Sequence, residues 1–203
     1  MSKIRAVRLG AAVLAVAGAL SACSSGNSGS PSPVGNSSSS AAAGSSSAAQ
    51  LAPSVPSPLP VDSLTANPCT ALSADQVTQQ GLTGAGEQGS SQTGPDCKWK
   101  SSTSQLNVVY ISPITGNKNG LSDTYALKSK FAYFEPTTVS GYPAVYAEAD
   151  DSRSIGDCSL WVGVTDQLAV SVSAQIGSGP NKSNPCPVTA RVAGAMITHL
   201  QGQ

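Results

Sequence analysis

LAVSVSAQI, residues 168–176, carries the strongest indication of the fold in this chain. Every second residue is apolar, which is typical of a β-strand with one buried face. Residues 159–165 carry Leu160, Val162 and Val164 in the same phase, and the short Asp166-Gln167 connection joins the two segments. This spacing predicts an antiparallel hairpin.

Further strands are expected over residues 97–101, 106–112, 136–140 and 144–149. A first helix should begin at Ser73, which has capping-box spacing to Gln76, and end at Gly81, with residues 81–86 forming the cap and a loop. Residues 119–132 predict a middle helix, and residues 185–199 a last one. Its apolar stripe consists of Val192, Ala193, Met196, Ile197 and Leu200. The predicted fold is a single α+β domain in which a mainly antiparallel sheet is packed by N-terminal, middle and C-terminal helices.

The N-terminus has the features of an export signal. Basic residues within residues 1–8 precede LGAAVLAVAGAL, residues 9–20, an apolar run shorter than the roughly 20 residues that span a bilayer. Leu20-Ser21-Ala22-Cys23 then resembles a bacterial lipobox. We expect residues 1–22 to be a lipoprotein signal peptide and Cys23 to be lipidated, which places the protein on the extracytoplasmic face of the cell membrane. An ordinary secretory leader and an uncleaved anchor are the alternatives.

Residues 23–63 are expected to form the lipidated N-terminus and a disordered tether. Residues 24–60 consist mainly of Ser, Ala, Gly and Pro and contain neither a charge nor an aromatic ring. Such a segment cannot bury enough apolar surface to offset the entropy lost on ordering. The extracytoplasmic domain is therefore assigned to residues 64–203, with ordered structure beginning near Asn67.

Four cysteines remain once Cys23 is assigned to the lipid, and two disulfides are expected in an exported chain. The favoured pairs are Cys69 with Cys97 and Cys158 with Cys186, because each closes a loop of fewer than thirty residues. Pairing Cys69 with Cys186 is the alternative. No C-x-x-C knuckle is present, so no metal site is expected.

Several of these elements together resemble a known family. They are Asn67-Pro68-Cys69, Gly81-Leu82, Cys97-Lys98-Trp99, Cys158 and Asn184-Pro185-Cys186, in addition to the lipobox. In this combination the chain resembles the actinobacterial lipoprotein family called domain of unknown function 3558. The resemblance implies an extracytoplasmic lipoprotein with an α+β domain similar to the PsbP-type fold. It implies no established activity and no catalytic residues.

Charge and motifs exclude several function classes. Without the three cations of the leader, 8 basic and 11 acidic residues remain, so nucleic acid is not an expected partner. The single histidine, His199, lies near the chain end, and no Gly-x-Ser-x-Gly elbow occurs. No cofactor and no catalytic residue are therefore assigned.

Two groups of residues remain as candidates for function. Acidic residues gather at 148–157 (Glu148, Asp150, Asp151 and Asp157), which is typical of a solvated turn and is the basis of an alternative function as an envelope hydrolase. Trp161 and Tyr146 are the candidates for a ligand or partner surface. The favoured function is a non-enzymatic binding module of the cell envelope, with a protein, a polymer or a small apolar ligand as partner.

Overall fold

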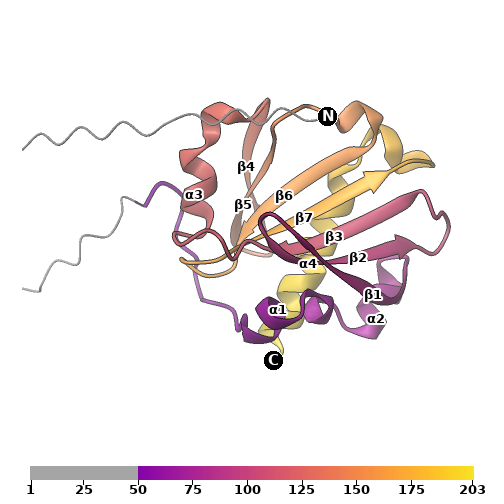
Figure 1. Ribbon diagram of the computed structural model, residues 1–203, viewed down its shortest axis with the longest axis horizontal. Helices are drawn as coiled ribbons and strands as arrows, with labels where there is room; N and C mark the ends of the chain where they lie inside the picture. The colour runs from indigo at the N-terminus through magenta and orange to yellow at the C-terminus, as the bar shows by residue number, and fades with distance from the viewer. Residues whose placement is uncertain (1–49) are drawn as a thin grey trace, which may run out of the picture. The chain divides into compact units, whose positions relative to one another are not determined.

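The computed structural model of the protein describes residues 50–203 (Figure 1). Cys23, the signal peptide predicted at residues 1–22 and the part of the predicted tether at residues 23–49 lie outside the described residues. None of the helices within residues 50–203 is long and apolar enough to cross a membrane.

One seven-stranded sheet forms the centre of the domain, with strand order β1-β2-β3-β7-β6-β5-β4 and antiparallel pairing throughout. The hairpin predicted from residues 159–176 is confirmed as β6 and β7. The strands are β1 (Leu82–Ser91), β2 (Gly94–Ser101), β3 (Asn107–Pro113), β4 (Tyr133–Val139), β5 (Tyr142–Glu148), β6 (Asp157–Gly163) and β7 (Ala169–Ile176).

The helices are α1 (Asp62–Ala66), α2 (Ala74–Gln79), α3 (Leu121–Ala126) and α4 (Cys186–Gln201), with 3-10 turns η1 (Pro68–Ala71), η2 (Lys128–Lys130), η3 (Arg153–Ile155) and η4 (Pro180–Ser183). The capping box between Ser73 and Gln76 is confirmed at the start of α2. Of the middle helix expected over residues 119–132, only α3 and η2 are helical.

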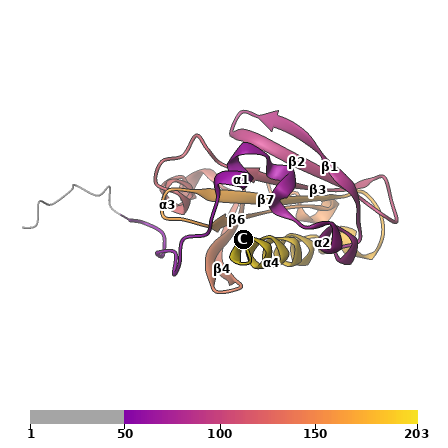
Figure 2. The same cartoon turned by 90° about the horizontal axis from the view of Figure 1, so that it is seen from below.

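The two faces of the sheet have different coverings. Helix α4 packs on one face (Figure 2). All five residues of its predicted apolar stripe are buried there. The alternation along β7 is confirmed, because Val170, Val172 and Ala174 point into this main core. On the opposite face, Leu121 at the start of α3 contributes to a smaller apolar cluster with Val145 and Trp161.

The two disulfides link a helical turn to a strand, and the favoured connectivity is confirmed. Cys69 in η1 is bonded to Cys97 in β2, with a Cα–Cα distance of 5.0 Å. Cys158 in β6 is bonded to Cys186 at the first residue of α4, with a Cα–Cα distance of 5.2 Å. The sheet and the helices packed on it form a single α+β domain, and the two disulfides cross-link it.

Strand β1 corrects the prediction that residues 81–86 form a cap and a loop. Gly81 does end α2, with φ of +70°. Pairing with β2 nevertheless begins at Leu82, and a register shift lies between Thr83 and Glu87. The sequence concealed this strand because its side chains are mostly exposed, so no apolar period of two exists.

Residues 50–63 correct the predicted boundary of the tether. Val55 and Leu59 are buried in the main core, and the Leu59 N–H donates to the carbonyl oxygen of Val164 at 2.9 Å. The first helix, α1, also begins before Asn67. A few isolated apolar residues among prolines and serines are enough to fill grooves on a folded domain, although they could not form a core alone.

Candidate ligand-binding cavity

A cavity of about 390 Å³ opens at the end of the sheet where β3 begins and β7 ends. Its walls come from five separate segments of the chain, so only the folded domain assembles it. The lining residues lie at 80–82, 101–104, 107–109, 176–181 and in α4, where Val188 and Arg191 face the cavity. This volume is within the range of sites that bind small molecules.

The apolar part of the cavity is continuous with the main core. Leu82, Val109, Ile176 and Val188 line it, and each of these side chains is at most 8% exposed. They lie on β1, β3, β7 and α4 and are held by the packing of the core. The cavity therefore has a preformed apolar surface that does not require rearrangement of the fold.

One polar wall is fixed by hydrogen bonds between Asn107 and Ser178. The amide of Asn107 donates to the Ser178 carbonyl oxygen, and its oxygen accepts from the Ser178 N–H, both at 3.0 Å. The hydroxyl groups of Ser104 and Ser178 are 2.8 Å apart. Because the donors and acceptors of these residues bond to one another, the wall is rigid, and it acts on a ligand mainly through its shape.

Arg191 supplies the positive charge of the cavity. It lies on α4, its side chain is exposed, and its guanidinium makes a long contact of 3.4 Å with the carbonyl oxygen of Pro187. Within residues 50–203, no carboxylate forms an ion pair with Arg191. The side chains of Gln80 and Asn181 also line the cavity. A cation beside an apolar surface favours a ligand with an apolar body and an anionic group.

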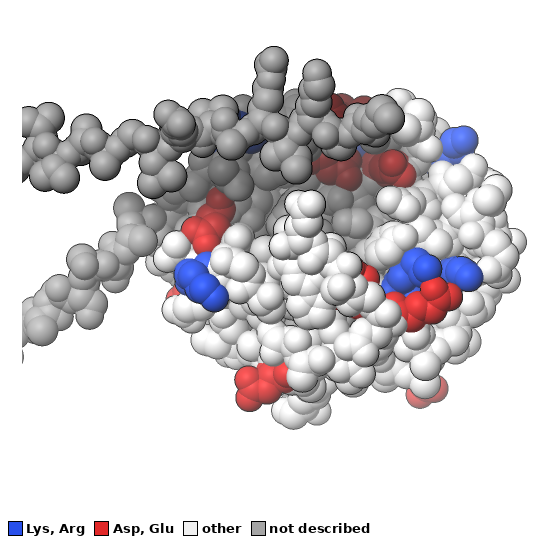
Figure 3. All heavy atoms as spheres, in the orientation of Figure 1, with Lys and Arg blue, Asp and Glu red and all other residues white. Residues whose placement is uncertain are grey.

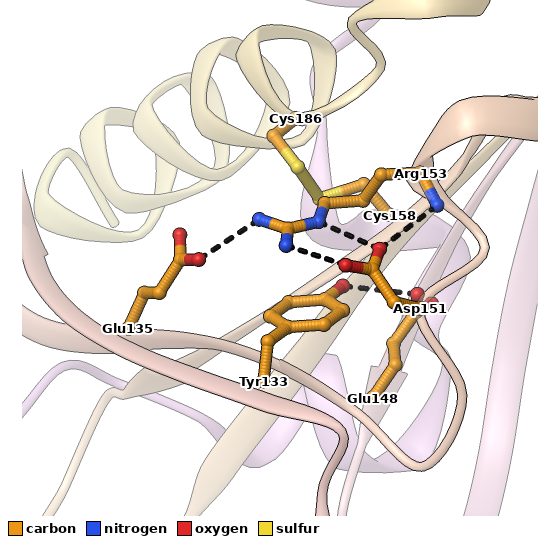
Figure 4. Close-up of polar contacts among 7 residues, drawn as sticks. All are labelled: Tyr133, Glu135, Glu148, Asp151, Arg153, Cys158 and Cys186. Carbon is orange, nitrogen blue, oxygen red and sulfur yellow. Dashed lines mark hydrogen bonds and ion pairs between the residues drawn. A yellow bond between two sulfur atoms is a disulfide. The ribbon is translucent and has the colours of Figure 1, made fainter.

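The acidic residues at 148–157 do not converge on one site. Asp151 accepts two hydrogen bonds from the Arg153 guanidinium, at 2.8 and 2.7 Å, and one from the Arg153 backbone N–H at 3.3 Å (Figure 4). The guanidinium lowers the pKa of the Asp151 carboxyl group. Arg153 also donates to Glu135 on β4 at 2.9 Å. Glu148 instead accepts from Ser159 at 2.8 Å. Among the described residues, no group of three His, Cys, Asp or Glu side chains is arranged to hold a metal ion.

Arg153 also stacks on an aromatic ring. Its guanidinium lies 3.9 Å from the centre of the Tyr133 ring, and the Tyr133 hydroxyl donates to Glu148 at 2.9 Å. Burial, together with this hydrogen bond to Glu148, raises the pKa of Tyr133. These residues fix the connection between β5 and β6 to the edge strand β4. Sequence reasoning missed Glu135 and Tyr133 as partners because strand pairing alone brings them near Arg153.

Trp161 and Tyr146 lie on opposite faces of the sheet, so the structure does not bring them together. In the register, Tyr146 pairs with Leu160 and Trp161 pairs with Val145. Tyr146 packs against the main core on the α4 side, whereas Trp161 packs against the smaller cluster. His199 is half-buried in the last turn of α4.

The residues that line the cavity carried no signal in the sequence. Arg191, Asn107 and Ser178 are single polar residues on three separate segments, and no motif links them. Only the packing of α4 against the end of the sheet brings them to one place.

The fold and cavity define a disulfide-bonded α+β domain with a preformed pocket at one end of its sheet. By comparison with known families, the chain belongs to the family described as Protein of unknown function (DUF3558), whose model matches residues 18–199. The resemblance found in the cysteine and proline motifs is confirmed at this level. No curated protein and no solved structure matches the chain.

Proposed function

We propose that the protein is an actinobacterial lipoprotein that is anchored through Cys23 and binds a small amphipathic anion at the extracytoplasmic face of the membrane. The leader and lipobox of residues 1–23 support the anchor. The two disulfides support an oxidising compartment, because such bonds persist outside the cytosol. The role is one of binding, with no catalytic step.

The observation that carries the proposal is the pairing of Arg191 with the apolar cavity wall. A carboxylate or phosphate on the ligand would bond to the guanidinium, and its apolar part would lie against Leu82, Val109 and Val188. The hydrogen-bonded wall at Asn107 limits the shape of the ligand. The ligand thus belongs to the class of small molecules with one anionic end.

The position of the cavity suits a domain held from the other end of β7. The described chain begins beside the β6–β7 connection, where the Val55 N–H bonds to Asp166. The cavity lies beyond Ile176, at the far end of the same strand. Eight residues of β7 separate the two ends by about 25 Å. The cavity and the point where the N-terminal segment contacts the domain therefore lie at opposite ends of β7.

The test uses the mature protein extracted from membranes in detergent. Mass spectrometry should find the N-terminal peptide beginning at an acylated Cys23. In titrations with decanoate, decyl phosphate and uncharged decanol, the two anionic probes should bind more tightly than decanol. Arg191→Gln should weaken the binding of the two anionic probes about tenfold or more, because a charge-assisted hydrogen bond is lost. Lys130→Gln, which removes an exposed cation outside the cavity, is the matched control. Equal binding of all three probes, or an unmodified Cys23, would refute the corresponding half of the proposal.

An envelope hydrolase acting through residues 148–157 is the alternative, and it has less support. A general acid needs a carboxyl group whose pKa is raised. The pKa of Asp151 is instead lowered by Arg153, and Glu148 is engaged by Tyr133 and Ser159. The geometry of this region is that of a structural network.

A further inference from the structure

A second concave surface lies on the sheet face opposite α4. We call it the sheet-face trough; its volume is about 320 Å³. It is lined by Ser91, Thr93, Asp96, Tyr110, Ser112, Ile114, Trp161, Ser171, Ser173 and Gln175. None of these residues lines the cavity at Arg191. The trough is therefore a separate site, and its ligand is a question independent of the proposed function.

The strand register arranges the trough residues in rows across the sheet. Asp96 on β2 is followed by Ser112 on β3, Ser171 on β7 and Trp161 on β6, each on the strand next to the one before. The adjoining row contains Tyr110 and Ser173 as direct partners. Three strand spacings place Asp96 and Trp161 about 14 Å apart. This is a length over which an extended chain of small polar units can lie.

Some polar groups of the trough are already hydrogen-bonded, Ser91 with Thr93 and Ser171 with Ser173, while others have no side-chain partner. Within the described residues, the Asp96 carboxylate forms no ion pair, and no side-chain hydrogen bond engages Asp96, Tyr110 or Gln175. The indole N–H of Trp161, by contrast, already donates to the carbonyl oxygen of Ala147 at 2.9 Å. Trp161 can therefore offer a ligand its ring but no hydrogen bond.

The charges around the trough are balanced, which favours neither an anionic nor a cationic ligand. Lys98 and Lys100 lie on β2, on the same side of the sheet as Asp96, and both are paired with Glu87 on β1. Asp96 forms no ion pair within the described residues, and its carboxylate together with that of Glu87 balances the two lysines, so this group carries no net charge. Where this side of the molecule is visible, charged residues form small groups separated by uncharged surface (Figure 3). Hydroxyl, amide and carboxylate groups beside aromatic rings suit a ligand that is uncharged and rich in hydroxyls.

The sheet face also disfavours a peptide bound as an added strand. Such binding uses unpaired backbone groups at a sheet edge. The trough is centred on β3 and β7, which are inner strands paired on both sides. Only side chains are available there for binding.

We propose that the sheet-face trough binds a neutral glycan chain. The apolar C–H faces of the sugar rings pack against the rings of Trp161 and Tyr110. The sugar hydroxyls form hydrogen bonds with Asp96, Ser112 and Gln175. The domain then has two sites, one for a small anion and one for a polymer of uncharged sugars.

The test titrates the full mature protein in detergent with maltohexaose, cellohexaose and chitohexaose, using tryptophan emission and calorimetry. At least one hexasaccharide should bind saturably and change the emission. Asp96→Ala and Tyr110→Ala should each weaken the affinity for this hexasaccharide about tenfold, since each removes a direct polar or stacking contact. The matched control is Tyr146→Ala, a tyrosine on the opposite face of the sheet, which should leave the affinity unchanged.

Three further variants identify the site. Trp161→Phe should abolish the emission change, because the remaining Trp99 is 1% exposed and packs in the main core on the other face. Asp96→Asn keeps the size of a half-buried side chain and should weaken binding without altering the fold. Arg191→Gln should leave glycan affinity unchanged, which separates this site from the cavity. The proposal is overturned if no hexasaccharide binds, if Tyr146→Ala weakens binding as much as Tyr110→Ala, or if Arg191→Gln abolishes it.

Discussion

The backbone N–H of Val55 donates to the carboxylate of Asp166 at 3.0 Å, across 111 positions of sequence. Together with the hydrogen bond from Leu59 to Val164, this contact fastens residues 50–61 to the β6–β7 connection. The Tyr142 hydroxyl adds a third contact by donating to the Ser57 carbonyl oxygen at 2.9 Å. The segment, which we call the N-terminal strap, is part of the folded domain although its composition is that of a linker.

Removing the N-terminal strap should destabilise the domain. A chain that starts at residue 62 loses the burial of Val55 and Leu59, and each of these side chains contributes about 1.5–3 kcal/mol. We expect the free energy of unfolding in urea to fall by about 3–6 kcal/mol relative to a chain that starts at residue 50. Within the longer chain, Asp166→Ala should cost about 1 kcal/mol. Ser57→Ala, which keeps the carbonyl group, should have no effect. Equal stability of the two chain lengths would show that the strap does not contribute.

Gly86 and Gly84 offer a paired test of packing under β1. Both have positive φ, +81° and +74°, so alanine strains the backbone at either position. A Cβ at Gly84 meets no atom within 4 Å, whereas one at Gly86 meets the Cys97 sulfur and lies 2.8 Å from the Trp99 indole. Gly84→Ala should cost about 1 kcal/mol, and Gly86→Ala about 1–3 kcal/mol more from overpacking. Urea unfolding of the two variants measures this difference, and equal costs would contradict the close packing of β1 on Trp99.

Asp151 should make stability depend on pH in the acid range. Hydrogen bonds from Arg153 lower its pKa in the folded protein, so the folded state favours the ionised carboxyl group. The resulting stabilisation is fully present above the pKa of an unfolded aspartate. It is lost as the pH falls through the lower folded pKa.

A carbon-13 NMR titration of the Asp151 carboxyl group measures this effect directly. Arg153→Gln should move the midpoint upward, towards the usual aspartate value, and flatten the acid dependence of unfolding. Lys130→Gln serves as the charge-removal control, and it should leave the midpoint in place. A midpoint that Arg153→Gln does not move would rule out the ion pair as the cause.

Prediction of the fold succeeded where burial imposed a regular pattern. The alternation in residues 168–176 and the stripe on α4 both arise because one face of each element is buried. Strand β1 and the N-terminal strap were missed for the opposite reason. The first is a mostly exposed edge strand, and the second is a proline-rich segment that buries a few isolated residues.

Prediction of the candidate sites was less complete. Trp161 was chosen as a surface residue, and it lines the sheet-face trough, but its proposed companion Tyr146 lies on the other face. The residues that share this face with Trp161, Ser171 beside it and Ser112 on the next strand, are set by strand register. Nothing in the local sequence specifies which strands are adjacent.

The α+β class and family membership follow from the sequence alone, because they depend on local periodicity and on short motifs. Cysteine spacing favoured the two disulfide pairs, and the structure settled them against the alternative pairing. Only the tertiary structure decided where Arg191, Asn107 and Ser178 meet, and which face of the sheet carries Asp96 and Trp161. The physical reason is that both sites are made of single residues from distant segments, whose proximity follows from sheet order and helix packing and leaves no pattern along the chain.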